Sequence, residues 1–335
     1  IFFCDAACGA LTRNRGSPTR QTRMTRHIRY AFLTCINANV TLFLFCKRLI
    51  CLISMLPGNR GFYHEKSHMN IMREITMNET DKQDKSFPAG MVPLGKSKFS
   101  FSCHPGVSCF MKCCSNVDML LYPYDIIGLK KRLGIRSDQF LEKYVQVVKG
   151  ANPFFPALMM KMTSTNSCPF LGVEGCTVYE QRPLSCRMYP LERGVDRTPE
   201  KGRAAEFYFL THHDYCKGHE EKQEWSVKEW LRSQNLLFHN AMADQWAEMD
   251  TLFAKNPWAG EGAAGPMQKL AFLICYNIDG FRDYVAHHNL LDLFKISPNR
   301  LRSIENDDEA LLTFGFDWLK LMLAGMPILQ PRKNR

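Results

Sequence analysis

Eight cysteines between residues 103 and 216 are the residues of this sequence best placed to do chemistry. Four stand in the run FSCHPGVSCFMKCCSN, residues 101–116, and three in CPFLGVEGCTVYEQRPLSCRMYP, residues 168–190. Both runs read as loops and short elements. Cysteine thiolates bind zinc and also hold iron–sulfur clusters. The sequence therefore predicts metal binding, with these candidate ligands: Cys103, Cys109, Cys113, Cys114, Cys168, Cys176, Cys186 and Cys216.

Disulfide bonds are a weaker explanation for so many thiols. A chain of 335 residues can bury a core without covalent staples, and no convincing secretory signal precedes these cysteines. Eight thiols suit two four-ligand centres, or one cluster with one mononuclear site. Composition leaves zinc and an iron–sulfur cluster equally open as the cofactor. Cys275, in the apolar run LAFLICYN, is instead expected to be a buried core residue.

The adjacent pair Cys113–Cys114 gives a geometric constraint. Consecutive side chains point to opposite faces of a strand, or about 100° apart on a helix. Both thiols would therefore strain to bind the same zinc ion, whose sulfur ligands lie roughly 3.8 Å apart. The pair predicts a branch point between two metal environments, or ligation of two irons of one cluster. If residues 107–114 are helical, Cys109 and Cys113 share a face and Cys114 turns towards the other centre.

Charged and aromatic residues beside the cysteines could support such centres, because four thiolates around a divalent ion leave about two negative charges. An ordinary surface pair between Glu180 and Arg182 is the alternative. Histidines near the cysteines could replace a thiol, but a histidine near a cysteine is usually not a ligand, so they are left out of the predicted set. The supporting residues considered are Lys112, Tyr179, Glu180, Arg182, Arg187 and Tyr189, and the histidines are His104, His212, His213 and His219.

Helical periodicity outside the cysteine runs predicts a mostly α fold with an irregular, metal-stapled cysteine-rich centre and few short strands. Residues 150–205 are rich in Gly, Pro and polar residues and read as irregular. Ser226 and Glu229 form a capping box before the longest apolar stripe. The predicted helices are 122–134, 137–148, 227–254, 267–276, 279–295 and 307–324, and the extended segments are 157–162 and 206–210.

The net charge of +10 is concentrated at the start of the chain. Residues 1–76 hold 11 Lys and Arg against 3 Asp and Glu, which leaves 32 against 30 in the remainder. The near-neutral body argues against nucleic-acid binding. Residues 31–56 are apolar but interrupted by Asn, Lys and Arg, so no membrane span is expected unless this stretch is truly expressed. We interpret 1–76 as non-native upstream translation, or a disordered or targeting extension, and 77–97 as a disordered leader.

The pattern C-x5-C-x3-C-C, followed by CPFL and by C-x-VYEQRP-x2-CR-x-YP, resembles the YkgJ-type cysteine-cluster family of bacteria and archaea. Its members are described as zinc- or iron-chelating proteins. The resemblance covers roughly residues 98–240, and the first gap, five residues, is longer than the family's usual two or three. By this resemblance the seven cysteines from Cys103 to Cys186 are the metal ligands, and Cys216 is the eighth.

The expected organisation is a cysteine-cluster metal-binding domain at 98–225 with a helical region, 226–328, packed on it. A cytoplasmic metal-binding protein is the first hypothesis. An iron–sulfur-dependent protein-modifying enzyme is the second, because distantly similar proteins include a flagellin lysine methylase; no nucleotide loop, HExxH or G-x-S-x-G motif supports it. The third is a zinc-stapled module that binds a protein partner. Whether any reaction is catalysed stays open at this stage.

Overall fold

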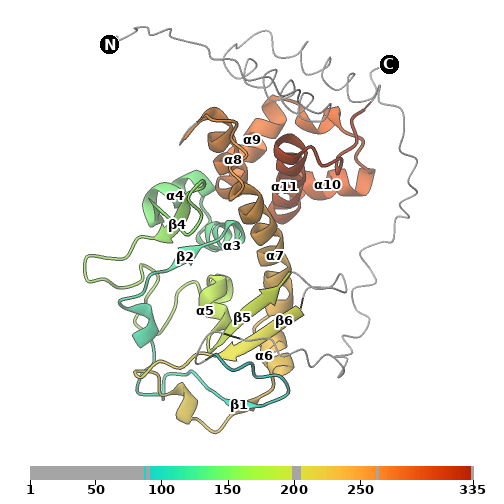
Figure 1. Ribbon diagram of the computed structural model, residues 1–335. Helices are drawn as coiled ribbons and strands as arrows, with labels where there is room; N and C mark the ends of the chain where they lie inside the picture. The colour runs from blue at the N-terminus through green and yellow to red at the C-terminus, as the bar shows by residue number, and fades with distance from the viewer. Residues whose placement is uncertain (1–86, 88–90, 198–204, 262–263, 333–335) are drawn as a thin grey trace, which may run out of the picture. The chain divides into compact units, whose positions relative to one another are not determined.

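Among the residues that the structure describes, most helical ones follow residue 225, and short strands and turns dominate before it (Figure 1). The computed structural model describes residue 87 and residues 91–197, 205–261 and 264–332, which cluster into one compact unit. The predictions for residues 1–76, and most of those for 77–97, lie outside the described residues. Within the described residues, no helix combines the length and the apolar character required to cross a bilayer.

The part before residue 226 contains short elements joined by turns. Its helices and 3-10 helices are η2 (Lys112–Cys114), α3 (Pro123–Leu133), α4 (Ser137–Tyr144), η3 (Tyr179–Gln181), α5 (Leu184–Met188) and η4 (Gly218–Glu220). Its strands are β1 (Phe99–Ser100), β2 (Leu120–Leu121), β3 (Val145–Val148), β4 (Ala157–Met160), β5 (Leu191–Asp196), β6 (Ala205–Leu210) and β7 (Glu224–Trp225).

The part after residue 225 is helical. Its elements are α6 (Val227–Ser233), α7 (Leu236–Phe253), α8 (Pro266–Tyr276), α9 (Ile278–His287), η5 (Leu290–Leu293), α10 (Pro298–Asn306) and α11 (Asp308–Ala324). Helix α7 packs against α3, α5, α6 and α11, so it joins the two parts of the fold. The prediction of a mostly α fold with few short strands is confirmed for the described residues.

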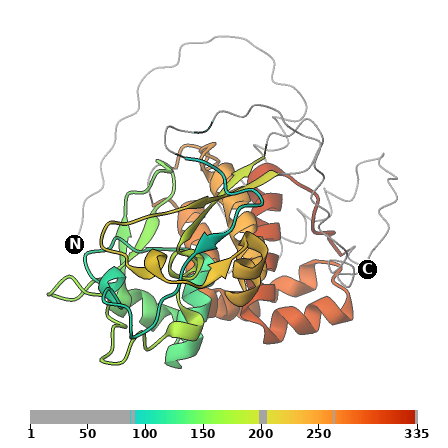
Figure 2. The ribbon, with the colours of Figure 1, turned by 90° about the horizontal axis from the view of Figure 1, so that it is seen from below.

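In the described part of the chain, three small antiparallel sheets connect distant segments. β1 pairs with β7, β4 lies between β2 and β3, and β5 pairs with β6 over six residues. Strand β1 therefore lies beside the chain that contains η4 and β7, as the view from below shows (Figure 2). The extended segments predicted at 157–162 and 206–210 are confirmed as β4 and β6, whereas β5 was not predicted.

Three predicted helices are wrong in extent. The helix predicted at 227–254 is two helices, because Asn235 adopts a left-handed φ of 53° between α6 and α7. The helix predicted at 137–148 ends at Tyr144, because the β-branched run after it pairs with β4, and Val147 is exposed rather than inward. The helix predicted at 279–295 ends at His287, and α10 was not predicted.

The predictions for 122–134, 267–276 and 307–324 are confirmed as α3, α8 and α11. Helix α3 begins at Pro123, where the Asp125 carboxylate accepts a hydrogen bond from the Tyr122 N–H at 2.9 Å. It ends before Gly134, whose φ of 66° suits a residue without a side chain. Cys275 is 2% exposed in α8, so its predicted place in the core is also confirmed.

Two groups of buried side chains hold the fold. One consists of the fully buried side chains between α7, α8, α9 and α11, among them Phe253, Phe281 and Phe314. The other surrounds the cysteine-bearing segments, and its members are Phe99, Phe101, Val107, Cys109, Met188, Leu191, Tyr208, Cys216, Val227, Trp230, Leu231 and Leu236. Two candidate ligands, Cys109 and Cys216, thus belong to a hydrophobic core.

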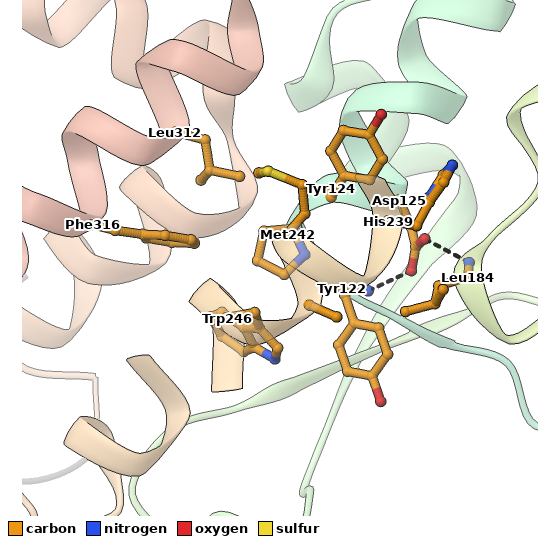
Figure 3. A pocket seen from close by; sticks show the side chains of 11 residues that line it. Tyr122, Tyr124, Asp125, Leu184, His239, Met242, Trp246, Leu312 and Phe316 are labelled. Carbon is orange, nitrogen blue, oxygen red and sulfur yellow. Dashed lines mark hydrogen bonds between the residues drawn. The ribbon is translucent and has the colours of Figure 1, made fainter. Parts of the chain in front are cut away.

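A small cavity lies where α3, α5, α7 and α11 meet (Figure 3). Asp125 lines it and accepts hydrogen bonds from the backbone N–H groups of Tyr122 and Leu184, at 2.9 and 2.8 Å. Burial raises the pKa of Asp125 to about 6. His239 also lines the cavity, and burial, with the nearby Arg187 and Arg182 guanidiniums, lowers its pKa to about 4. In this cavity the pKa of the carboxyl group is therefore higher than that of the imidazole, the reverse of their usual order.

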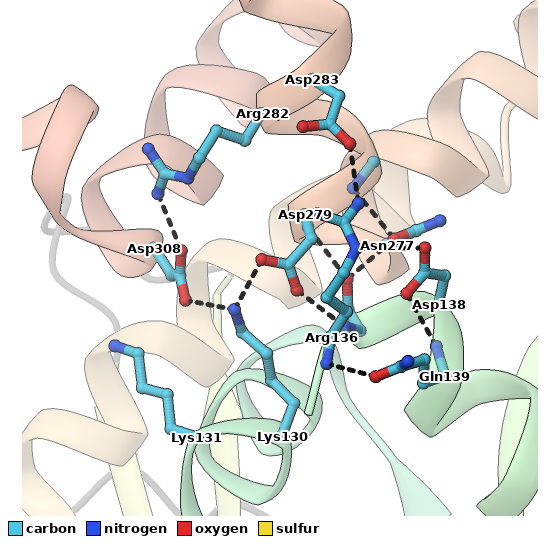
Figure 4. A network of polar contacts seen from close by, with 12 residues as sticks. Lys130, Lys131, Arg136, Asp138, Gln139, Asn277, Asp279, Arg282, Asp283 and Asp308 are labelled. Atoms are coloured by element: carbon cyan, nitrogen blue, oxygen red, sulfur yellow. Dashed lines mark hydrogen bonds and ion pairs between the residues drawn. The ribbon is translucent and has the colours of Figure 1, made fainter. Parts of the chain in front are cut away.

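A polar network joins α3 and α4 to α9 and α11 (Figure 4). Lys130 Nζ lies 2.9 Å from Asp279 Oδ1 and 2.9 Å from Asp308 Oδ2. Asp279 also accepts the backbone N–H of Ser137 at 2.6 Å, and Arg282 binds Asp308 at 2.7 Å. These contacts fix the N-terminus of α4 and the middle of α3 on the helical part.

Candidate metal centre

The run that contains the first four cysteines is a series of turns rather than an α-helix. The N–H of Phe110 donates to the Val107 carbonyl and that of Lys112 to the Cys109 carbonyl, each bond closing a tight turn. Met111 has a left-handed φ of 66°, and only residues 112–114 form a 3-10 helix. The idea that Cys109 and Cys113 share one face of an α-helix is therefore wrong.

The first thiol group consists of Cys103, Cys109, Cys113 and Cys216. Backbone bonds bring its segments together: the Ser102 N–H donates to the Gly218 carbonyl at 3.0 Å, and the Lys217 N–H donates to Cys109 Sγ at 3.0 Å. The pKa of Cys103 is raised to about 11, mainly by burial and to a smaller extent by the thiols of Cys113, Cys109 and Cys216. Cys103 thus lies within electrostatic reach of the other three thiols, although up to 113 residues separate it from them in the chain.

The second thiol group consists of Cys114, Cys168, Cys176 and Cys186. The Cys168 N–H donates to the Cys114 carbonyl at 2.7 Å, next to a β-bridge between Ser115 and Ser167. A second bridge pairs Leu171 with Cys176. These contacts align the CPFL run with the end of the first cysteine run.

Electrostatic contacts tie Cys186 of α5 into the second group. Burial raises the pKa of Cys186 to about 12, with further contributions from Cys113, Cys168, Asp125 and Cys176. Its side chain nevertheless retains exposed surface, so an ion can reach the thiol from solvent. A hydrogen bond with Cys113 is the first cause of the raised pKa of Cys114, followed by burial, Cys113's charge, Cys168 and Cys186.

The adjacent pair lies between the two groups. Cys113 interacts with Cys103 of the first group and with Cys168 and Cys186 of the second. A hydrogen bond from Cys114 lowers the pKa of Cys113 to about 7, so Cys113 is the thiol that ionises most readily where a shift is resolved. The branch point between two metal environments stays a prediction, because the Cys113 and Cys114 thiols are hydrogen-bonded to each other.

Access from solvent differs among the eight thiols. Cys109 and Cys216 are buried, Cys103, Cys113 and Cys186 are exposed, and the remaining three are intermediate. All nine cysteines in the described residues are free thiols. Within those residues, no three His, Cys, Asp or Glu side chains stand in an arrangement that would already hold an ion. The fit to a metal therefore rests on donor chemistry: eight soft thiol donors in two groups of four suit zinc or iron–sulfur chemistry.

The two arginines near the thiols do not form the surface pair considered as the alternative. Arg182 stacks on the Tyr179 ring at 3.9 Å and donates to the Tyr179 carbonyl and to Gln234. Arg187 is buried and donates to the Glu180 and Gln234 carbonyls at 2.5 and 3.0 Å. Both arginines therefore hydrogen-bond the α6–α7 turn to the segment that carries Cys176 and Cys186. Arg182 also lies within electrostatic reach of Cys103.

Gly218 is a site residue that the sequence did not single out. A Cβ at this position would lie 2.7 Å from the Ser102 carbonyl oxygen and 2.8 Å from the Phe101 ring. Only glycine allows the chain after Cys216 to approach the chain before Cys103 so closely. The run CKG after the last candidate ligand was the available clue.

We expect Gly218→Ala to lower the free energy of unfolding by about 1–3 kcal/mol, because the new methyl group meets backbone that cannot move away freely. Lys217→Ala, at the exposed neighbouring position, should change it by less than about 0.5 kcal/mol. Urea unfolding followed by tryptophan fluorescence measures both. Equal stabilities for the two variants would contradict the close approach.

A comparison with known protein families gives a match for the cysteine-rich segment. Residues 102–225 match the model of the CxxCxxCC family, described as a "Putative zinc- or iron-chelating domain". The matched segment contains all eight candidate ligands. The match lies within the 98–240 range of the resemblance found in the sequence. No curated protein and no solved structure matches the chain.

Proposed function

We propose that residues 98–225 bind two thiolate metal centres, and that the helical residues 226–328 pack on this domain. The first centre would use Cys103, Cys109, Cys113 and Cys216. The second would use Cys114, Cys168, Cys176 and Cys186. The metal is zinc at each centre, or iron in an iron–sulfur cluster, as the family description allows.

The contacts of two thiols support this proposal: Cys103 lies within electrostatic reach of Cys113, Cys109 and Cys216, and Cys186 lies within reach of Cys113, Cys168 and Cys176. The backbone bond between Cys168 and Cys114 and the bond from Lys217 N–H to Cys109 Sγ support the division independently of charge.

Metal binding at these positions would stabilise the least regular part of the fold. Strands β1, β2 and β7 have two residues each, which is too short to hold the segments between them by backbone pairing alone. A bound ion cross-links four such segments, and its binding free energy adds to folding free energy. Zinc would supply this cross-link without redox change, and an iron–sulfur cluster would add one-electron chemistry.

The test is metal analysis of the full chain purified without oxygen, together with serine variants of one cysteine from each group. Zinc, iron and acid-labile sulfide are quantified, and the absorbance spectrum is recorded. Cys216→Ser should remove about half of the bound metal, Cys176→Ser the other half, and the double variant all of it. Cys275→Ala is the matched control and should keep the full amount, because Cys275 is buried in α8 away from both groups.

Two outcomes would overturn the proposal. The first is a protein that binds no zinc and no iron under these conditions. The second is loss of all metal in both single variants while circular dichroism shows native helix content, since that would mean one shared centre rather than two.

A further inference from the structure

Two histidines next to the first thiol group face each other closely enough to share an ion. His212 follows strand β6 and His219 lies in η4, and their ring centroids are 4.6 Å apart, with planes inclined by 30°. A zinc-sized ion bound by two imidazole nitrogens at about 2.0–2.1 Å holds the ring centroids about 5 Å apart. His212 is exposed and His219 half-buried, so an ion can reach both from solvent.

The backbone around this pair is held in place. The N–H of Thr211, next to His212, donates to the Pro190 carbonyl at 2.8 Å. Gly218, next to His219, accepts from the Ser102 N–H at 3.0 Å, and the His219 ring packs on Phe101 with centroids 5.3 Å apart. The two imidazoles are thus presented by fixed segments rather than by long free side chains.

His219 also has the hydrogen bonding typical of a metal ligand. Its ring is hydrogen-bonded to the backbone of Thr211, which fixes the ring and leaves a lone pair on the other nitrogen. Nε2 lies 3.4 Å from the Tyr189 hydroxyl, a long and weak contact that an ion could replace. Burial raises the pKa of Tyr189, and the neighbouring Cys216 thiol contributes to this shift. Tyr189 therefore lies between the imidazole pair and the first thiol group.

We propose that His212 and His219 bind a borderline divalent cation such as Zn²⁺ as a pair and are the point at which the ion enters the first thiol group; the entry role rests on the thiol centres proposed above. Two imidazoles leave the remaining coordination positions to water, so binding here is weak and reversible, as an entry site requires. The ion then exchanges imidazole for thiolate ligands. Each thiol that binds it releases its proton to solvent, and no electron is transferred.

Stopped-flow uptake of Co²⁺ by the metal-free full chain tests the entry role, because cobalt–thiolate bonds absorb strongly. His212→Ala and His219→Ala should each slow uptake at least 10-fold while the final absorbance stays at the wild-type value. His287→Ala and His288→Ala are matched controls, since that pair lies at the end of α9 with ring centroids 4.9 Å apart. Wild-type uptake rates in His212→Ala and His219→Ala would overturn the entry role.

Ni²⁺ binding to a thiol-deficient variant separates this proposal from the thiol centres. In Cys103→Ser/Cys109→Ser/Cys113→Ser/Cys216→Ser, calorimetry should detect one weakly bound Ni²⁺ that is lost when His212→Ala is added. Normal metal content in the wild type with no Ni²⁺ bound by a folded thiol-deficient variant would overturn the histidine site and leave the thiol centres standing. Ni²⁺ bound at the pair in a chain whose thiols bind no metal would support the site and overturn its entry role.

Discussion

Replacing Lys130 with methionine is expected to lower the free energy of unfolding by about 3–5 kcal/mol, the usual cost of removing one partner from a buried ion pair. Lys130 Nζ lies 2.9 Å from carboxylate oxygens of both Asp279 and Asp308, whose side chains are only 15% and 10% exposed (Figure 4). Asp308 keeps Arg282 as a partner in the variant, but Asp279 keeps only polar contacts with Ser137. Most of the expected destabilisation therefore comes from the Asp279 carboxylate, which is left buried without a cationic partner.

Lys131→Met is the matched control for this prediction. Lys131 pairs with Glu309 at 2.9 Å, but its side chain is 44% exposed, so its loss should cost less than about 1 kcal/mol. Adding Asp279→Asn to Lys130→Met should recover part of the stability, because it removes the unpaired buried charge. Urea unfolding followed by circular dichroism measures all three. If Lys130→Met lies within 1 kcal/mol of the wild type, the network does not hold α3 on the helical part.

Asp125 and His239 are expected to give opposite pH dependences of stability that nearly cancel in the wild type. The pKa of Asp125 rises from 3.8 to about 6 on folding, so its stabilising contribution is present below pH 3.8 and is lost as the pH rises through 6. The pKa of His239 falls from 6.5 to about 4, so its contribution is present above pH 6.5 and is lost as the pH falls through 4. Each shift corresponds to about 3 kcal/mol.

Single variants should expose the two effects. As the pH rises from 4 to 6.5, the free energy of unfolding of Asp125→Asn should increase by about 3 kcal/mol relative to the wild type. The reason is that only the pH dependence of His239 is left in this variant. Over the same rise in pH, the free energy of unfolding of His239→Gln should decrease by about 3 kcal/mol relative to the wild type, because only the pH dependence of Asp125 is left. The double variant should restore the wild-type slope and is the control. Parallel pH profiles for all four proteins, measured by urea unfolding, would show that the cavity does not shift these pKa values.

Local patterns were sufficient to predict several elements. Gly134 and the proline-led capping of α3 define that helix within the sequence itself, and the apolar stripes of α8 and α11 predict them directly. The break at Asn235 could not be predicted in this way, because the side chains that clamp the α6–α7 turn, Arg182 and Arg187, come from about 50 residues earlier. Likewise, Val145–Val148 continues a helical pattern but pairs with β4, and local periodicity does not record that partner.

The sequence alone determined which chemistry is available: eight thiols, one adjacent pair and a family pattern that the comparison confirms for residues 102–225. It also predicts that Cys113 and Cys114 belong to different metal environments, because consecutive side chains usually diverge. Only the tertiary structure decided which thiols are neighbours, because backbone bonds such as Cys168 to Cys114 and Ser102 to Gly218 join segments 54 and 116 residues apart. Contacts of that length depend on the packing of the whole domain, and no local pattern encodes them.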